Sequence, residues 1–351
     1  MERAPEDAQG VLDLVSGQAV RRLAVLGIVI STTACDNVDW GGTSIHLVPP
    51  PAAVVGAASD STRDEQDRGT VLPDGPVLYE ATRDSSGVHL VPVGEIEGDS
   101  LDPFRDEKSA PGYRGAFARE QMAAGTRFTL FSAGVRVGTF TARVVGTDES
   151  FCTPRPSAEG VVELVPGAAD ATHFLALPER FTDSTAYAPY QPLETDRVQR
   201  AAGIGLAAEV IPQIGATWPS SMVEARADMQ GFQQADGAAA VSTTFVFRDQ
   251  VKIQPAEPRS YSLYLLATLE GEQYQTAYVW YREAGREGKG VPRYFQHLDW
   301  NGDGRTEILL EVLGERHRWN AVVQRRGNAW TRTFEDPCGA AAPKVLERAT
   351  R

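Results

Sequence analysis

Between residues 240 and 334, apolar and polar side chains alternate in short runs, and this alternation restricts the fold more than any other feature of the chain. A two-residue repeat puts successive side chains on opposite faces of a strand, so it indicates β-strands here. Tight turns at Gly271 and at Gly327-Asn328 join several of the runs. The pattern predicts an antiparallel meander or sandwich of about seven strands, at residues 244–247, 261–268, 277–281, 294–298, 307–313, 319–324 and 330–334.

This C-terminal β region is predicted to cover residues 233–339, followed by a tail at 340–351. A second β region is predicted over residues 76–182. Its clearest signal is a hairpin in which residues 126–131 and 135–145 flank Ser132-Ala133-Gly134. A small sheet that closes on itself or packs as a sandwich is expected. Shorter runs of the same region lie at 163–165 and 174–176.

Residues 183–232 connect the two β regions and are rich in helix formers. We predict one helix over residues 193–211, capped by Thr195 and stopped by Pro212, and a second over residues 219–229. The predicted fold class is therefore mainly β (α+β), with antiparallel sandwich or meander regions and one or two linking helices.

Within the first of these helices, residues 203–208 spell GxGxxA, the pattern of a dinucleotide-binding turn. That turn must follow a strand, whereas charged helical sequence precedes this segment, so the sequence argues against a dinucleotide site. We expect Gly203 and its small neighbours instead to let another backbone approach the helix.

The composition bounds the class of protein. At 351 residues, with 42% hydrophobic and 23% charged residues, the chain has core material for one large or two modest globular domains. The net charge of -13 argues against a nucleic-acid partner, because phosphate binding needs a basic surface. An acidic surface suits divalent cations, although it also serves simply to keep a protein in solution.

The N-terminal segment has the order of a signal peptide, predicted over residues 1–34. Arg21 and Arg22 precede an apolar run at residues 23–30, which passes through small residues to Cys35. The run is too short to span a bilayer. The alternative is a buried helix or strand that happens to precede a cysteine.

The segment before Cys35 resembles the lipobox of bacterial lipoproteins, with Ala34 and Thr33 in place and Thr32 where the family usually carries leucine. This resemblance implies that Cys35 is lipidated and becomes the mature N-terminus. Residues 35–75, rich in proline and small residues, then form a flexible tether. The implied location is the cell envelope, with the membrane bound through the lipid anchor and the body facing the periplasm or exterior.

With Cys35 assigned to the lipid, Cys152 and Cys338 remain as a pair in a chain that enters an oxidising compartment. Both lie beside turn-forming residues, so we predict a disulfide between them. Two free, buried cysteines are the alternative. The chain has no CxxC spacing that would favour zinc.

One motif carries recognisable chemistry. From Asp299 to Glu307, oxygen-bearing side chains recur at alternate positions, with glycines where the chain must turn. Calcium takes six to eight oxygen ligands at about 2.4 Å, and such a loop can supply them. A metal-free turn of the Asn-Gly, Asp-Gly type is the alternative.

The segment resembles the DxNGDGxxE calcium loops of FG-GAP and VCBS-type repeats. Since those families carry several copies and this chain carries one, we transfer only the loop. The resemblance implies a structural Ca²⁺ with a Kd of about 0.1–1 mM. The implied ligands are the side chains of Asp299, Asn301, Asp303 and Glu307 and the backbone carbonyl of Arg305.

The sequence contains no HExxH, GxSxG or P-loop motif, and its five histidines are scattered. We therefore expect a non-enzymatic binding or structural protein of the cell envelope, with a protein or glycan partner. The alternative is an envelope hydrolase that uses a carboxylate pair. A flat aromatic surface around Tyr278, Trp280 and Trp300 would favour binding, although such residues often lie in a core. His297, beside the loop, could support the metal or simply face the sheet.

Overall fold

The computed structural model describes residues 39–40, 43–44, 71–105, 107–182, 185–337 and 345–346. Antiparallel sheets dominate this part of the chain, which confirms the predicted mainly β class. The described residues all belong to one compact unit. A two-stranded pairing of β1 (Asp39–Trp40) with β2 (Thr43–Ser44) precedes the main body.

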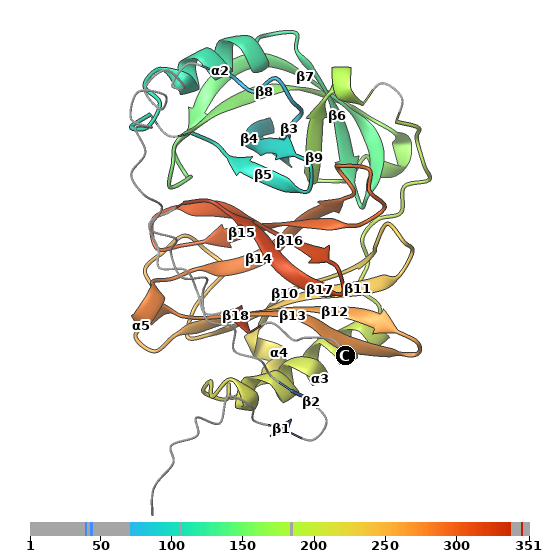
Figure 1. The fold of residues 1–351 in the computed structure, drawn as a ribbon, viewed down its shortest axis with the longest axis vertical. Helices are drawn as coiled ribbons and strands as arrows, with labels where there is room; N and C mark the ends of the chain where they lie inside the picture. Colours follow the sequence, from blue (N-terminus) through green and yellow to red (C-terminus); the bar gives the residue numbers. More distant parts are fainter. Residues whose placement is uncertain are drawn as a thin grey trace, which may run out of the picture. The chain divides into compact units, whose positions relative to one another are not determined.

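The first β region is a seven-stranded sheet that closes on itself (Figure 1). Its order is β3-β9-β6-β7-β8-β4-β5, and a further pairing of β3 with β4 joins every strand except β5 into a ring. The predicted hairpin is present, with Ala133 and Gly134 at positive φ angles of 52° and 75°. The strands are β3 (Val77–Asp84), β4 (Gly87–Glu97), β5 (Ser100–Pro103), β6 (Arg127–Ser132), β7 (Val135–Asp148), β8 (Arg155–Leu164) and β9 (His173–Pro178).

The ring is filled by aromatic side chains. Tyr79, Phe128 and Phe140 lie in one buried cluster, in which the Tyr79 and Phe128 rings meet edge to face at 4.9 Å. Helix α2 (Tyr113–Gln121) adds Tyr113 and Phe117, one turn apart on the same helix face. The sequence did not predict α2, because its other residues show no apolar helical stripe. Two short 3₁₀ turns, η2 (Pro166–Ala168) and η3 (Glu179–Phe181), flank β9.

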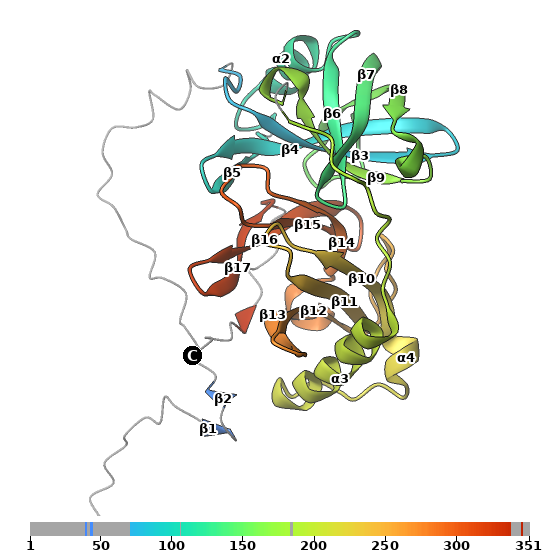
Figure 2. The ribbon, with the colours of Figure 1, turned by 90° about the vertical axis from the view of Figure 1, so that its right-hand side faces the viewer.

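The C-terminal region is a sandwich of two antiparallel meanders, as predicted (Figure 2). Its core contains Tyr264 and Trp280 from one sheet and Trp319 and Trp330 from the other. The first sheet comprises β10 (Arg226–Gln233), β11 (Ala239–Phe247), β12 (Tyr261–Glu270), β13 (Gln273–Glu283) and, at its edge, β18 (Val345–Leu346) from the predicted tail. The second comprises β14 (Val291–Leu298), β15 (Glu307–Leu313), β16 (Arg318–Arg326) and β17 (Ala329–Glu335). Short α5 (Ala284–Glu287) follows β13.

The sheet β14–β17 is buried on both faces. Along β15, Ile308 and Leu310 enter the sandwich core, whereas Leu309, between them, joins a cluster with Leu78 and Val93 of the ring. Every residue of β15 is buried. The polar residues that alternate with apolar ones here therefore face a protein surface and not solvent, which sets up the charge network described below.

Helix α3 (Arg197–Gln213) covers the outer face of the sheet β10–β13, where Ala207 and Ile211 pack against Leu263. Its cap is Asp196, in a reciprocal capping box with Gln199, and not Thr195 as predicted. Thr195 instead accepts a hydrogen bond from the Gly231 N–H at 3.0 Å.

Two further helix predictions were wrong in detail. Pro212 lies inside the last turn of α3, which ends one residue later at Gln213, so the helix extends two residues beyond its predicted end. The helix predicted over 219–229 shrinks to α4 (Met222–Ala225), because Arg226 onward pairs with β11 as an edge strand. The predicted connector 183–232 therefore contributes β10 to the sandwich.

The glycines of the GxGxxA segment have different surroundings. A Cβ on Gly203 would lie 2.7 Å from both Met229 Cε and Thr243 Oγ1, so this glycine admits side chains of the sheet and not another backbone. A Cβ on Gly205 would meet nothing within 4 Å.

This contrast provides a matched pair of substitutions on one helix. We expect Gly205→Ala to raise the free energy of unfolding by about 0.5–1 kcal/mol through helix propensity. Gly203→Ala should lower it by about 1 kcal/mol, because crowding against Met229 and Thr243 outweighs the same gain. Urea denaturation of both variants measures the difference, and equal effects would contradict the packing seen at Gly203.

Candidate calcium loop and a buried charge network

The predicted metal loop joins β14 to β15. The carboxylate of Asp299 accepts hydrogen bonds from three loop N–H groups, those of Gly302 at 2.8 Å, Asp303 at 3.0 Å and Gly304 at 2.8 Å. Gly302 and Gly304 have φ angles of 74° and 81°, which side-chain-bearing residues rarely adopt. The loop is therefore wound around the carboxylate of its first residue.

The side chains of Asn301 and Asp303 also accept hydrogen bonds from N–H groups of the loop. The Asn301 Oδ1 atom accepts from the Asp303 N–H at 3.1 Å, and the Asp303 Oδ1 atom accepts from the Arg305 N–H at 2.8 Å. A residue that sequence reasoning missed, Asp99 in the β4–β5 turn, accepts from Asn301 Nδ2 at 3.2 Å. This contact keeps the amide oxygen of Asn301 turned toward the loop.

Glu307 is the buried member of the loop, 2% exposed at the start of β15. Its Oε2 atom accepts from the Trp300 N–H at 3.2 Å. Burial, together with the nearby Asp299 and Asp303 carboxylates, raises the pKa of this carboxyl to about 8. A cation among these three groups would relieve their repulsion.

These donors have the chemistry that calcium prefers, since all are hard oxygens. As the loop stands, however, its carboxylates are turned toward N–H groups. Within the described ranges, no group of three or more His, Cys, Asp or Glu side chains is placed to hold a metal ion. The donor set fits calcium, and binding it would require the carboxylates to turn from those N–H groups, so the calcium site stays a prediction.

The residues around the loop are mostly core. Tyr278, Trp280 and Trp300 are all buried, so they form no flat aromatic surface. His297 is also buried, and its Nδ1 atom lies 2.6 Å from the Tyr294 hydroxyl. Burial lowers the pKa of His297 to about 4, which keeps the ring neutral near pH 7. His297 thus faces the sheet.

The predicted cysteine sites are only partly covered by the structure. Cys35 and Cys338 lie outside the described residues, so lipidation and the Cys152–Cys338 pairing stay predictions. Cys152 itself is disulfide-bonded and packs, partly buried, against the sandwich core.

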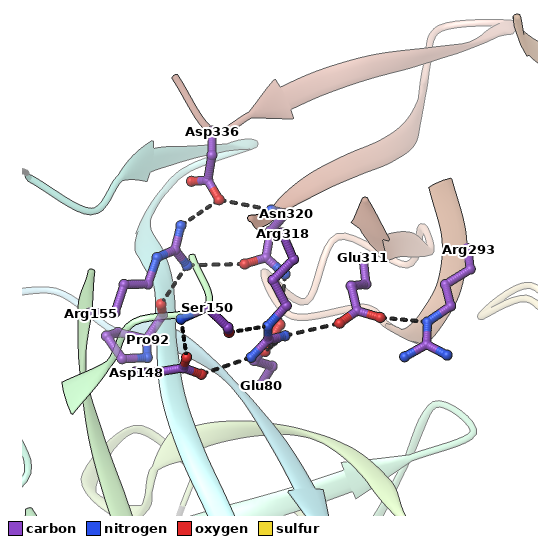
Figure 3. A network of polar contacts seen from close by, with 10 residues as sticks. All are labelled: Glu80, Pro92, Asp148, Ser150, Arg155, Arg293, Glu311, Arg318, Asn320 and Asp336. Carbon is purple, nitrogen blue, oxygen red and sulfur yellow. Dashed lines mark hydrogen bonds and ion pairs between the residues drawn. The ribbon is translucent and has the colours of Figure 1, made fainter. Parts of the chain in front are cut away.

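A network of charged side chains, which the sequence did not predict, lies between the ring and the sheet β14–β17 (Figure 3). We call it the buried charge network. It comprises Glu80, Asp148, Ser150, Arg155, Arg293, Glu311, Arg318, Asn320 and Asp336, with the Pro92 carbonyl.

Arg318 is the centre of one half of this network. Its guanidinium contacts Glu80 at 2.5 Å, Asp148 at 3.0 Å and Glu311 at 3.2 Å, and Nε donates to Ser150 Oγ at 2.9 Å. These three carboxylates come from β3, β7 and β15, and together they raise the pKa of Arg318 although burial opposes them. Arg318 therefore ties the ring to the sheet.

Arg155 organises the other half and is 1% exposed. Its guanidinium donates to the Pro92 carbonyl at 2.7 Å, to Asn320 Oδ1 at 3.0 Å and to the carboxylate of Asp336. Asn320 in turn donates from Nδ2 to Glu80 at 2.7 Å, which connects the two halves.

Phe151 lies between the two arginines. The guanidinium carbons of Arg155 and Arg318 stand 4.2 Å and 4.0 Å from its ring centroid, at cation–π distance.

The pKa values of Asp336 and Asp148, the two aspartates of the network, are shifted in opposite directions. Burial raises the pKa of Asp336, and the Arg155 guanidinium lowers it only in part. Burial also acts to raise the pKa of Asp148, but hydrogen bonds from Ser150 and the charge of Arg318 outweigh it and hold the pKa below its usual value.

The arrangement bears on the hydrolase alternative. Among the described residues, three carboxyls have raised pKa values: Asp228, Glu307 and Asp336. None of the three lines either of two hollows in the described part of the chain, one within residues 73–117 and one within residues 234–327. These two hollows therefore give no support to the hydrolase alternative.

Among the described residues, no helix is long and apolar enough to cross a membrane. Comparisons of the chain with protein-family models, with curated proteins and with solved structures give no match.

Proposed function

We propose that this chain is a lipid-anchored lipoprotein of the bacterial cell envelope whose β body is a non-enzymatic binding or structural module, held together at one end by a calcium loop. The observation that carries the calcium part of the proposal is the winding of residues 299–304 around the Asp299 carboxylate, with the buried Glu307 beside it. The lipid anchor rests on the sequence from Arg21 to Cys35.

The position of the loop supports a structural role for calcium. The Asp99 turn contacts the loop through Asn301, and its backbone carbonyl also accepts hydrogen bonds from Gln324 at 2.8 Å and Arg326 at 3.2 Å. The loop thus lies where the ring meets the sheet β14–β17. A cation that orders the loop would strengthen this junction, because it would bind the folded state and not the unfolded chain.

The calcium prediction is tested on the full chain purified with Cys35→Ser. With a Kd of about 0.1–1 mM, calcium at about 5 mM should stabilise the fold by about 1–2 kcal/mol and raise the Tm by a few degrees. Asp303→Ala should abolish the rise. Asp170→Ala, which changes an exposed aspartate elsewhere, should retain it. The absence of a rise in the parent protein would reduce the loop to a turn.

The anchor is tested by expressing the full chain with its N-terminal segment in a bacterial host supplied with labelled palmitate. We expect label on the parent protein and its recovery with membranes. Cys35→Ala should remove both, since the thiol is the acylated atom. Label that persists in Cys35→Ala, or a parent protein that carries none, would contradict the lipoprotein assignment.

A further inference from the structure

A polar hollow opens beside the calcium loop, with a volume of about 260 Å³. Three turns build it: the β10–β11 turn with Gln234 and Asp236, the end of the loop with Arg305, and the β16–β17 hairpin with Arg325. A hydrogen bond from the Ala235 N–H to Thr306 Oγ1 at 2.6 Å joins the first two turns, and the pairing of Glu307 with Gln324 holds the third beside the loop. The hollow thus has a fixed frame.

Glycines keep the hollow open. Gly304 and Gly327 line it, and a Cβ on either residue would meet nothing within 4 Å. Both also have positive φ angles, so a residue with a side chain would be strained there. The space between the two arginines is therefore free of side chains from these positions.

The charges that line the hollow are unusual for this chain. Arg305 and Arg325 bring two positive charges against one carboxylate, Asp236, in a protein whose net charge is -13. Arg305 makes only a long contact of 4.0 Å with Asp303. Within the described part of the chain, the Arg325 guanidinium has no hydrogen bond or ion pair. Two guanidinium groups with so few hydrogen bonds and ion pairs favour the binding of an anion in the hollow.

The other lining groups restrict the kind of anion. The Asp236 carboxylate would repel a phosphate or sulfate, but it accepts hydrogen bonds from hydroxyl groups. The Gln234 amide can both donate to hydroxyls and accept from them. A ligand with one carboxylate and several hydroxyl groups satisfies both sides, and the volume suits a single ring and not an extended chain.

We propose that this hollow binds an acidic sugar unit, a monosaccharide that carries a carboxylate. Arg305 and Arg325 take the carboxylate by forked hydrogen bonds, and Gln234 and Asp236 face the hydroxyl groups. The inference rests on the proposed binding role of the β body and names the class of glycan that it takes.

The test is a calorimetric titration of the full chain, purified with Cys35→Ser, with sodium glucuronate at constant ionic strength. We expect a Kd on the order of 1 mM, typical of a small polar ligand. Arg325→Ala should raise the Kd about tenfold. Arg316→Ala, which removes an exposed arginine outside the hollow, should change it less than about twofold. Unchanged melting temperatures show that both variants fold.

Four outcomes would overturn the proposal. Glucose that binds as well as glucuronate would remove the role of the carboxylate. Inorganic phosphate that binds more tightly would make the hollow a general anion site. Equal losses in Arg325→Ala and Arg316→Ala would place any binding elsewhere, and the absence of glucuronate binding would remove the site.

The test is independent of the calcium titration. Glucuronate binding without a calcium-dependent Tm would retain the hollow and reject the metal loop. A calcium-dependent Tm without glucuronate binding would retain the loop and reject the hollow.

Discussion

Arg318→Met is expected to lower the free energy of unfolding by about 3–5 kcal/mol, because it leaves the carboxylate of Glu80 buried without its cation and that of Glu311 with Arg293 alone. Their side chains are 2% and 7% exposed, so water cannot replace the guanidinium. Methionine keeps much of the apolar stem, and the loss therefore reports on charge more than on packing. Urea denaturation at pH 7 measures it.

The pH dependence of this variant distinguishes charge from packing. In the parent protein, the charge of Arg318 helps to hold the pKa of Asp148 below its usual value. A carboxylate whose pKa is lowered by folding stabilises the protein above its unfolded pKa, and this contribution is lost as pH falls through the folded pKa. Arg318→Met lacks this contribution, so its deficit relative to the parent should be smaller at about pH 3 than at pH 7. A deficit that stays constant would assign the loss to packing.

An exposed ion pair supplies the control for Arg318→Met. Arg127 and Glu179 are 3.2 Å apart, with side chains 52% and 27% exposed. Arg127→Met should cost no more than about 1 kcal/mol, since solvent screens the pair.

Arg155→Met is the second substitution with a large expected effect, again about 3–5 kcal/mol. It removes the donor to the Pro92 carbonyl and to Asn320, and it leaves the Asp336 carboxylate uncompensated in the interior. Denaturation at pH 7 measures the loss.

A second substitution tests whether the buried charge of Asp336 causes the loss in Arg155→Met. In the parent protein, the Asp336 carboxylate accepts a hydrogen bond from the Asn320 N–H at 2.8 Å. Adding Asp336→Asn removes the charge but keeps an oxygen that can accept this bond. The double variant should recover about half of the loss or more. If Arg155→Met/Asp336→Asn is no more stable than Arg155→Met, the unpaired charge is not the cause.

Some helices and strands could be located from the sequence, and others could not. The seven C-terminal strands and the 126–145 hairpin were located correctly, because a strand's two-residue repeat and its turn residues are local properties. The start of β10 was missed, since residues 226–229 favour a helix locally and become a strand only by pairing with β11. Helix α2 was missed because its stability comes from the contacts of two aromatic side chains with the ring. Its own sequence has no apolar helical repeat that would predict it.

The candidate sites also differ in whether the sequence could predict them. The candidate calcium loop is contiguous, so the side chains predicted to bind calcium could be named from their spacing alone. The hollow with Arg305 and Arg325 brings together three turns that are distant along the chain, and the contact of Asp99 with Asn301 joins residues 202 positions apart. No local pattern marks such residues before the sheets are assembled.

The sequence by itself determined the strands, the main linking helix and the loop that suits calcium, because each depends on residues close along the chain. Only the tertiary structure decided that the ring closes through β3 and β4, and that the sheet β14–β17 is covered on both faces. Glu80 and Arg318, 238 residues apart, each occupy polar positions on alternating strands. Alternation shows which side chains share a face of a sheet, but not what covers that face. Here the ring covers the second face of the sheet β14–β17, and the polar side chains between the two become buried ion pairs.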